Sequence, residues 1–109
     1  MQIRAFRMSL NPGQEVEYQR RHAEIWPDLA ELLKASGIRW YRIFLDREHH
    51  ALFALMFLED EHQVDCLPEQ AIMQKWWEYM ADLMPANADK SPVSVDLEEM
   101  FSLYPQVMP

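Results

Sequence analysis

The stretch "IRWYRIFLDREHHALFALMFLE", residues 38–59, decides the fold of this chain. Its two apolar halves, 38–46 and 51–58, are rich in β-branched and aromatic residues, which are typical of strands. The polar segment "REHH" at 47–50 separates the halves and supplies a turn. The stretch therefore predicts an antiparallel β-hairpin.

Strand-like and helix-like patterns flank this hairpin on both sides. The first ten residues alternate as a strand does, and "NPG" at 11–13 ends the alternation. Helices are predicted over 14–26, 28–35 and 59–84. The last is interrupted at Pro68, which is tolerated as a first-turn residue of its second part. A further strand, of weaker pattern, is predicted over 96–104. The order β-α-β-β-α-β predicts a ferredoxin-like α+β fold, an antiparallel sheet with helices on one face.

The second half of the hairpin carries information about the outer face of the sheet. Residues 51–58 are apolar at every position, whereas a sheet with one face in water should alternate apolar and polar side chains. The second face is therefore expected to be buried as well. Packing against a second copy of the chain, as a homodimer, or around an enclosed pocket, would bury it.

Length, charge and cysteine content limit the class of protein. With 109 residues the chain is expected to form one domain, residues 1–103, followed by a tail, 104–109. Its net charge of -8 leaves little to neutralise phosphates, so a nucleic-acid partner is not expected. The single Cys66, read as a small core residue, and the lack of an apolar leader or spanning segment predict a cytoplasmic protein without membrane contact.

Tyr18 and His22 are the first candidates for chemistry. They lie four residues apart, so their side chains are expected to meet on one face of the first helix, separate from a core stripe of Val16, Ala23 and Trp26. An imidazole exchanges protons near neutral pH, and a phenol can orient it or bind a substrate oxygen. A packed tyrosine beside a locally bonded histidine remains the structural alternative.

Other reactive groups do not form a recognisable site. His49, His50 and His62 lack the spacing that would bring three or four metal ligands together, so no metal is expected. The chain has only Gly13 and Gly37, and therefore no glycine-rich phosphate loop. Phosphoryl transfer is correspondingly disfavoured.

Two neighbouring tryptophans, Trp76 and Trp77, stand in the helical segment "QKWWEYM", residues 74–80. Neighbouring helical side chains point about 100° apart, so both cannot occupy the centre of one buried stripe. Trp76 falls within the apolar arc and is expected in the core, while Trp77 lies at its edge. Trp77 either packs at an interface or forms the aromatic wall of a pocket, a surface suited to the C–H face of a sugar.

Three segments resemble the L-rhamnose mutarotase family. They are "YQRRHAEIWPDL" at 18–29, "KWWEYM" at 75–80 and "MPANADKSPVS" at 84–94, in the family's order and separations, and the similarity extends over about residues 2–103. The resemblance implies a cytoplasmic dimeric α/β barrel that interconverts the anomers of L-rhamnose without a cofactor. It implies His22 as the proton donor, and sugar binding by Tyr18, Tyr41, Trp76 and Trp77.

Two other functions share this expected fold. A small cofactor-free or heme-handling monooxygenase would bind an aromatic or porphyrin ligand, and heme would then show a shifted Soret band. A non-catalytic sugar-binding module would bind rhamnose without accelerating its anomer exchange. Because one fold carries many functions, these three functions have to be distinguished by the residues of the site.

Overall fold

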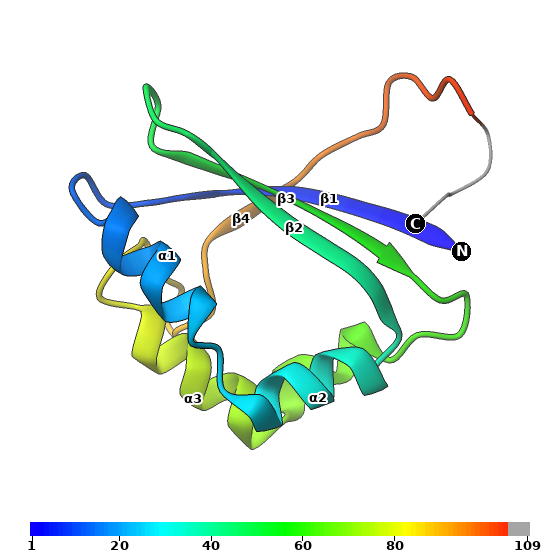
Figure 1. Cartoon of the computed structure of the whole chain (residues 1–109), viewed down its shortest axis with the longest axis horizontal. Helices are drawn as coiled ribbons and strands as arrows, with labels where there is room; N and C mark the ends of the chain where they lie inside the picture. The colour runs from blue at the N-terminus through cyan, green and yellow to red at the C-terminus, as the bar shows by residue number, and fades with distance from the viewer. Residues whose placement is uncertain (105–109) are drawn as a thin grey trace.

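The computed structural model describes residues 1–104 as a sheet with helices over one of its faces (Figure 1). The elements in chain order are β1 (Gln2–Ser9), α1 (Glu15–Ala23), α2 (Pro27–Ala35), β2 (Ile38–Asp46), β3 (Ala51–Leu58), the 3-10 helix η1 (Val64–Glu69), α3 (Ala71–Met80) and β4 (Ser94–Asp96). This order and the helix layer confirm the predicted ferredoxin-like α+β fold. None of the helices within residues 1–104 is long and apolar enough to cross a membrane.

β3 is a central strand of the antiparallel sheet. The strand order is β2-β3-β1-β4, so β3 pairs with both long neighbours. Asp46 pairs with Ala51 across the polar turn, which confirms the predicted hairpin and both of its strand boundaries. The Cα register changes between Ile38 and Trp40, where the β2 strand has an irregularity.

The core lies between the sheet and the helices. Alternate β3 residues, Leu52, Ala54, Met56 and Leu58, are buried on the face that meets the helices. The helices contribute to the same core cluster with Leu29, Met73, Trp76 and Met80. Trp76 is only 6% exposed, which confirms its predicted core position.

α1 presents a different face to the core from the predicted stripe. Val16 is 81% exposed and Ala23 is also exposed, whereas Tyr18 is buried. The helix ends at Ala23, before Trp26, so helical spacing no longer relates Trp26 to Val16. The prediction of a Val16, Ala23 and Trp26 stripe is therefore wrong, and the face that carries Tyr18 is the one that turns inward.

The segment around Pro68 also differs from the prediction. Pro68 lies inside η1, and α3 begins at Ala71 and ends at Met80. In a 3-10 helix residues three apart share a face, so Val64 and Leu67 are both buried. Cys66 lies off that face and is exposed, so its predicted core position is wrong.

The last strand is shorter and earlier than predicted. β4 pairs with β1 over only three residues, and Leu97 donates one further hydrogen bond to the carbonyl of Ala5. Residues 97–104 then run beyond the sheet on the side away from the helices (Figure 1), with exposed Met100 and Phe101. The predicted strand over 96–104 therefore overlaps β4 only at Asp96. The predicted tail, 104–109, lies outside the described residues except for Tyr104.

The outer face of the sheet is apolar and open. Phe44 of β2 pairs with Phe53 of β3, and their side chains are 54% and 37% exposed. The rings of Trp40 and Phe57 stack at 4.8 Å on the same face. Ile3 and Val95 extend this exposed apolar surface onto β1 and β4.

A glycine substitution tests the connection between α2 and β2. Gly37 has φ +101, and a Cβ there would lie 2.9 Å from Cβ and 3.0 Å from Cα of His62. We expect Gly37→Ala to lower the free energy of unfolding by about 2–4 kcal/mol, from left-handed strain plus overlap with backbone. Gly13→Ala is the control, because Gly13 also has positive φ but nothing within 4 Å of the new Cβ. Equal losses in urea denaturation of the two variants would contradict the overlap.

Candidate active site

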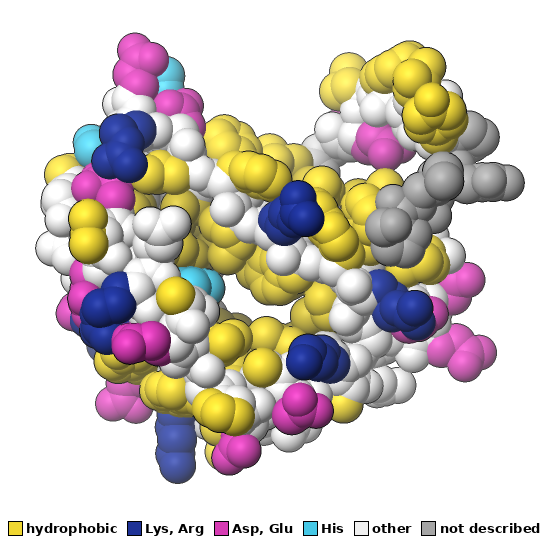
Figure 2. All heavy atoms as spheres, viewed as in Figure 1, with side chains coloured by type: hydrophobic (Ala, Val, Ile, Leu, Met, Phe, Trp, Pro, Cys, Tyr) yellow, Lys and Arg dark blue, Asp and Glu magenta, His cyan; other side chains and the backbone are white. Residues whose placement is uncertain are grey.

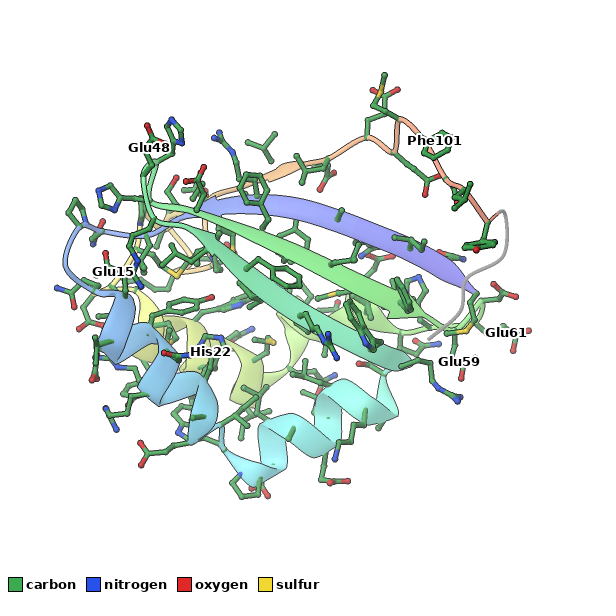
Figure 3. All side chains as sticks on the ribbon, turned by 45° about the horizontal axis from the view of Figure 1, so that its top comes forward. Glu15, His22, Glu48, Glu59, Glu61 and Phe101 are labelled. Carbon is green, nitrogen blue, oxygen red and sulfur yellow. The ribbon has the colours of Figure 1, made fainter. Side chains whose placement is uncertain are left out.

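Three elements bring four of the candidate side chains toward the space between the sheet and the helices. Tyr18 and His22 come from α1, Tyr41 from β2 and Trp76 from α3. The rings of Tyr18 and His22 stack with centroids 4.3 Å apart. Trp76 meets the His22 ring edge to face at 5.4 Å. Figure 3 shows His22 on α1 facing this space.

The molecule is hollowed at this place. Figure 2 shows an opening between the sheet and the helix layer, with hydrophobic side chains on its walls and a histidine at its edge on the side of α1. Tyr18 and Trp76 belong to the core cluster between the sheet and the helices, and Tyr41 packs against it. A small polar ligand with an apolar face suits such a lining.

One backbone hydrogen bond fixes the tautomer of His22. Nδ1 of His22 lies 3.1 Å from the carbonyl oxygen of Tyr18, one helical turn earlier. A carbonyl oxygen only accepts hydrogen bonds, so Nδ1 carries the proton that is donated. In the neutral imidazole Nε2 is therefore the basic nitrogen.

Burial keeps this imidazole neutral. Loss of solvation lowers the pKa of His22 below its usual value of about 6.5, and the hydrogen bond to the Tyr18 carbonyl raises it only in part. At neutral pH the ring is thus mainly uncharged. It can accept a proton at Nε2 and afterwards return it, as a general base and then a general acid.

The two tyrosines remain protonated. Burial, and secondarily the nearby phenol of Tyr41, raises the pKa of Tyr18. Burial raises the pKa of Tyr41 to about 12. Both phenols therefore keep their O–H groups at neutral pH and can donate to or accept from a ligand hydroxyl.

Trp77 lies apart from this aromatic group. Its ring is partly buried against the core and lines a separate surface hollow of about 330 Å³, together with Pro68, Gln74, Glu78, Asp89 and Lys90. Neighbouring positions on α3 diverge, as the predicted wheel requires. The structure therefore brings Tyr18, His22, Tyr41 and Trp76 together and places Trp77 at the edge of α3.

Three residues of the site's surroundings were not predicted. Trp26 meets the Trp76 ring edge to face at 5.1 Å and stacks with Tyr79 at 5.5 Å. The guanidinium of Arg21 lies 4.3 Å from the centroid of the Tyr79 ring. The spacing of Trp76 and Tyr79, three apart on a helix, is a signal from which their contact could have been predicted. No local pattern relates either residue to Arg21.

The remaining histidines lie elsewhere. Nδ1 of His49 lies 2.8 Å from Oδ2 of Asp46, Nδ1 of His50 lies 3.8 Å from Oε1 of Glu15, and Nε2 of His62 lies 3.3 Å from the Gln2 side chain. Within residues 1–104, no three side chains of the His, Cys, Asp and Glu types are grouped so that they could hold a metal ion. His22 is thus the histidine that meets the aromatic cluster.

Comparison with known proteins gives one consistent result. A family model described as L-rhamnose mutarotase matches residues 4–103. The L-rhamnose mutarotase of Brucella anthropi is 52% identical over 91% of this chain and 93% of its own length, and that of Paraburkholderia xenovorans is 48% identical over 94% and 96%.

A solved structure agrees with these relatives. The crystal structure of L-rhamnose mutarotase from Formosa agariphila superposes with a TM-score of 0.88 at 42% identity, covering 95% of this chain and all of that one. Sequence and fold therefore correspond over nearly the whole length of both chains. The chain belongs to the L-rhamnose mutarotase family.

Proposed function

We propose that this protein is an L-rhamnose mutarotase, an isomerase that interconverts the α and β anomers of the sugar. The observation that carries the proposal is the neutral His22 imidazole, which has a basic Nε2 and stacks on Tyr18 beside Trp76. Family membership supports the same activity. Proton transfer is chemistry that these side chains can supply, so the reaction is proposed to need no cofactor.

The proposed mechanism uses His22 to move one proton. Nε2 accepts the proton of the anomeric hydroxyl, and the C1–O5 bond breaks as C1 becomes an aldehyde. The ring oxygen receives a proton from the imidazolium, which returns His22 to its neutral form. Rotation about C1–C2 and the reverse steps then close the ring from the other face of the aldehyde. A single group that acts as base and then as acid satisfies the balance of protons.

The aromatic side chains are proposed to bind the sugar. The Tyr18 and Tyr41 hydroxyls, which remain protonated, can pair with sugar hydroxyls and thereby orient C1 toward His22. Trp76 offers a ring face and edge for the apolar C–H surface of the sugar. Trp77, whose ring lines the separate hollow at the edge of α3, is proposed to bind the sugar at the rim of the site.

We also propose that two copies of the chain pair through the outer sheet face, in the manner of a dimeric α/β barrel. Exposed Phe44, Phe53, Ile3 and Val95 support this proposal, because an apolar patch of this kind marks an interface. The exposed apolar side chains of residues 97–104 extend on the same side of the sheet. A cytoplasmic location and a single domain over residues 1–103 complete the proposal.

Removal of the imidazole tests the proposed activity. We expect His22→Ala to slow anomer exchange of L-rhamnose by about 100-fold to 10,000-fold, the range typical of a lost acid-base group. Saturation-transfer NMR on the two anomeric protons measures the exchange. His49→Ala, a change at the exposed turn, should leave the rate unchanged. Near-normal exchange by a folded His22→Ala variant would reject the assignment.

The lowered pKa of His22 predicts two pH dependences. The neutral form starts the reaction, so kcat/KM should fall as pH falls below about 6.5, with its midpoint below 6.5. The unfolded chain binds this proton at a higher pH than the folded chain, so stability should also fall as pH drops below about 6.5. Buffer-corrected exchange rates and urea titrations from pH 4.5 to 8 measure both. Activity that rises on acidification would instead require the imidazolium.

The dimer is tested by charges on the outer face. Light scattering after gel filtration should give a dimer at micromolar concentration, and a monomer for Phe44→Lys/Phe53→Lys, since four charges would then face one another across the interface. Val16→Lys introduces a charge at an apolar residue of α1 that is also exposed and lies away from the outer sheet face, and it should leave the dimer intact. A monomeric wild-type protein would contradict the proposed pairing.

A further inference from the structure

The side chain of Arg21 joins α1 to the end of α3. It is only 10% exposed, although it is charged. Its Nε donates to Oε2 of Glu17 at 2.7 Å, within α1. Two parallel hydrogen bonds, of 2.9 and 3.2 Å, reach the carboxylate of Asp82, and Nη1 also donates to the carbonyl of Tyr79 at 2.6 Å. Together these bonds connect the two helices that carry His22 and Trp76.

α1 has few other attachments. It is nine residues long, no side chain caps its N-terminus, and Tyr18 is its one buried residue. Its backbone does not pack closely on a neighbouring helix or strand. The position of the His22 ring relative to Trp76 therefore depends on side chains that bridge from α1 to α3, and a misplacement of about 1 Å can cost on the order of 100-fold in rate.

We propose that Arg21 is a positioning residue for the reaction: it holds α1 against α3 so that the His22 imidazole faces the bound sugar. This inference rests on the proposed mutarotase function. Arg21 is adjacent to His22 in sequence, and its guanidinium also lies over the Tyr79 ring, which contacts Trp76. The same side chain is thus linked to both sides of the His22–Trp76 contact.

The charges of this bridge are balanced over the working pH range. Arg20 and, next, Arg21 lower the pKa of Glu17 to about 2, and Arg21 lowers the pKa of Asp82. Both carboxylates stay ionised near neutral pH, so the bridge itself adds no titration there. The pH dependence of activity should therefore still report His22.

Lysine cannot reproduce this arrangement. The planar guanidinium presents several N–H groups in a fixed fork that matches a carboxylate, whereas an ammonium is a point charge on a flexible stem. Arg21→Lys thus keeps the charge and most of the packing while it removes the bidentate bond to Asp82. Asp82→Asn weakens the same bond from the segment that follows α3.

The experiment compares these two variants with a matched pair elsewhere. Arg39 of β2 and Glu59, the residue after β3, also form an ion pair between different segments, and neither belongs to α1 or α3. Arg39→Lys and Glu59→Gln therefore control for the loss of an arginine–carboxylate contact. Each variant is assayed for kcat and KM by anomer-exchange NMR, for thermal unfolding, and for the ring-proton shifts and titration of His22.

We expect Arg21→Lys to lower kcat about 10-fold to 100-fold with KM nearly unchanged, because geometry rather than binding is lost. The His22 ring protons should shift as their stacking on Tyr18 and Trp76 changes. Asp82→Asn should act in the same direction, and the double variant should be no worse than Arg21→Lys alone. The controls should leave kcat and the His22 signals unchanged.

Normal kcat and unshifted His22 signals in folded Arg21→Lys and Asp82→Asn variants would overturn the proposal. So would a loss of stability alone. If Arg21→Lys does not fold, Asp82→Asn decides by the same readouts. If the wild-type protein fails to accelerate exchange, the proposed function fails, and the His22 shifts still show whether Arg21 positions the ring.

Discussion

The unbroken apolar run of β3 is the constraint on which the rest of the structure depends. A strand whose residues are all apolar is best covered at the centre of a sheet, and β3 pairs there with β1 and β2. Its inner side chains pack in one core with residues of the three α-helices, which cover one face of the sheet. The polar turn at 47–50 sets the register of the hairpin, and with it the face to which each β2 side chain points.

The register of the hairpin determines which β2 side chains face the candidate site. Tyr41 pairs with Met56, a buried residue of the inner face, so Tyr41 also points toward the helices. Tyr18 and His22 approach from the opposite layer because α1 turns their face inward. The proposed chemistry lies between the sheet and the helices, where the loss of solvation outweighs the single hydrogen bond that favours a charged His22.

Among the charged pairs of the described residues, those near the candidate site contain the most buried side chain, that of Arg21. Most charged pairs in the described part of the chain are exposed and worth little to stability. The pairs of Arg21 differ because its guanidinium is largely buried between a short helix and the end of a longer one. Its proposed contribution is to hold α1 against α3, because α1 has few apolar contacts of its own.

The sequence by itself determined the features that near neighbours encode. The hairpin and its turn, the end of α2 at Ala35, the core position of Trp76, and the meeting of Tyr18 with His22 all follow from patterns among residues close together in the chain. The family segments also predicted which residues belong to the site, although their roles remain proposals.

Only the tertiary structure decided the features that depend on residues far apart in the chain. The inward face of α1, the exposure of Cys66 and the short β4 depend on which surface of another element is available to cover them. The bridge from Arg21 to Asp82 joins residues 61 positions apart. Local spacing cannot encode such contacts, because they exist only after the sheet has brought α1 and α3 to the same side.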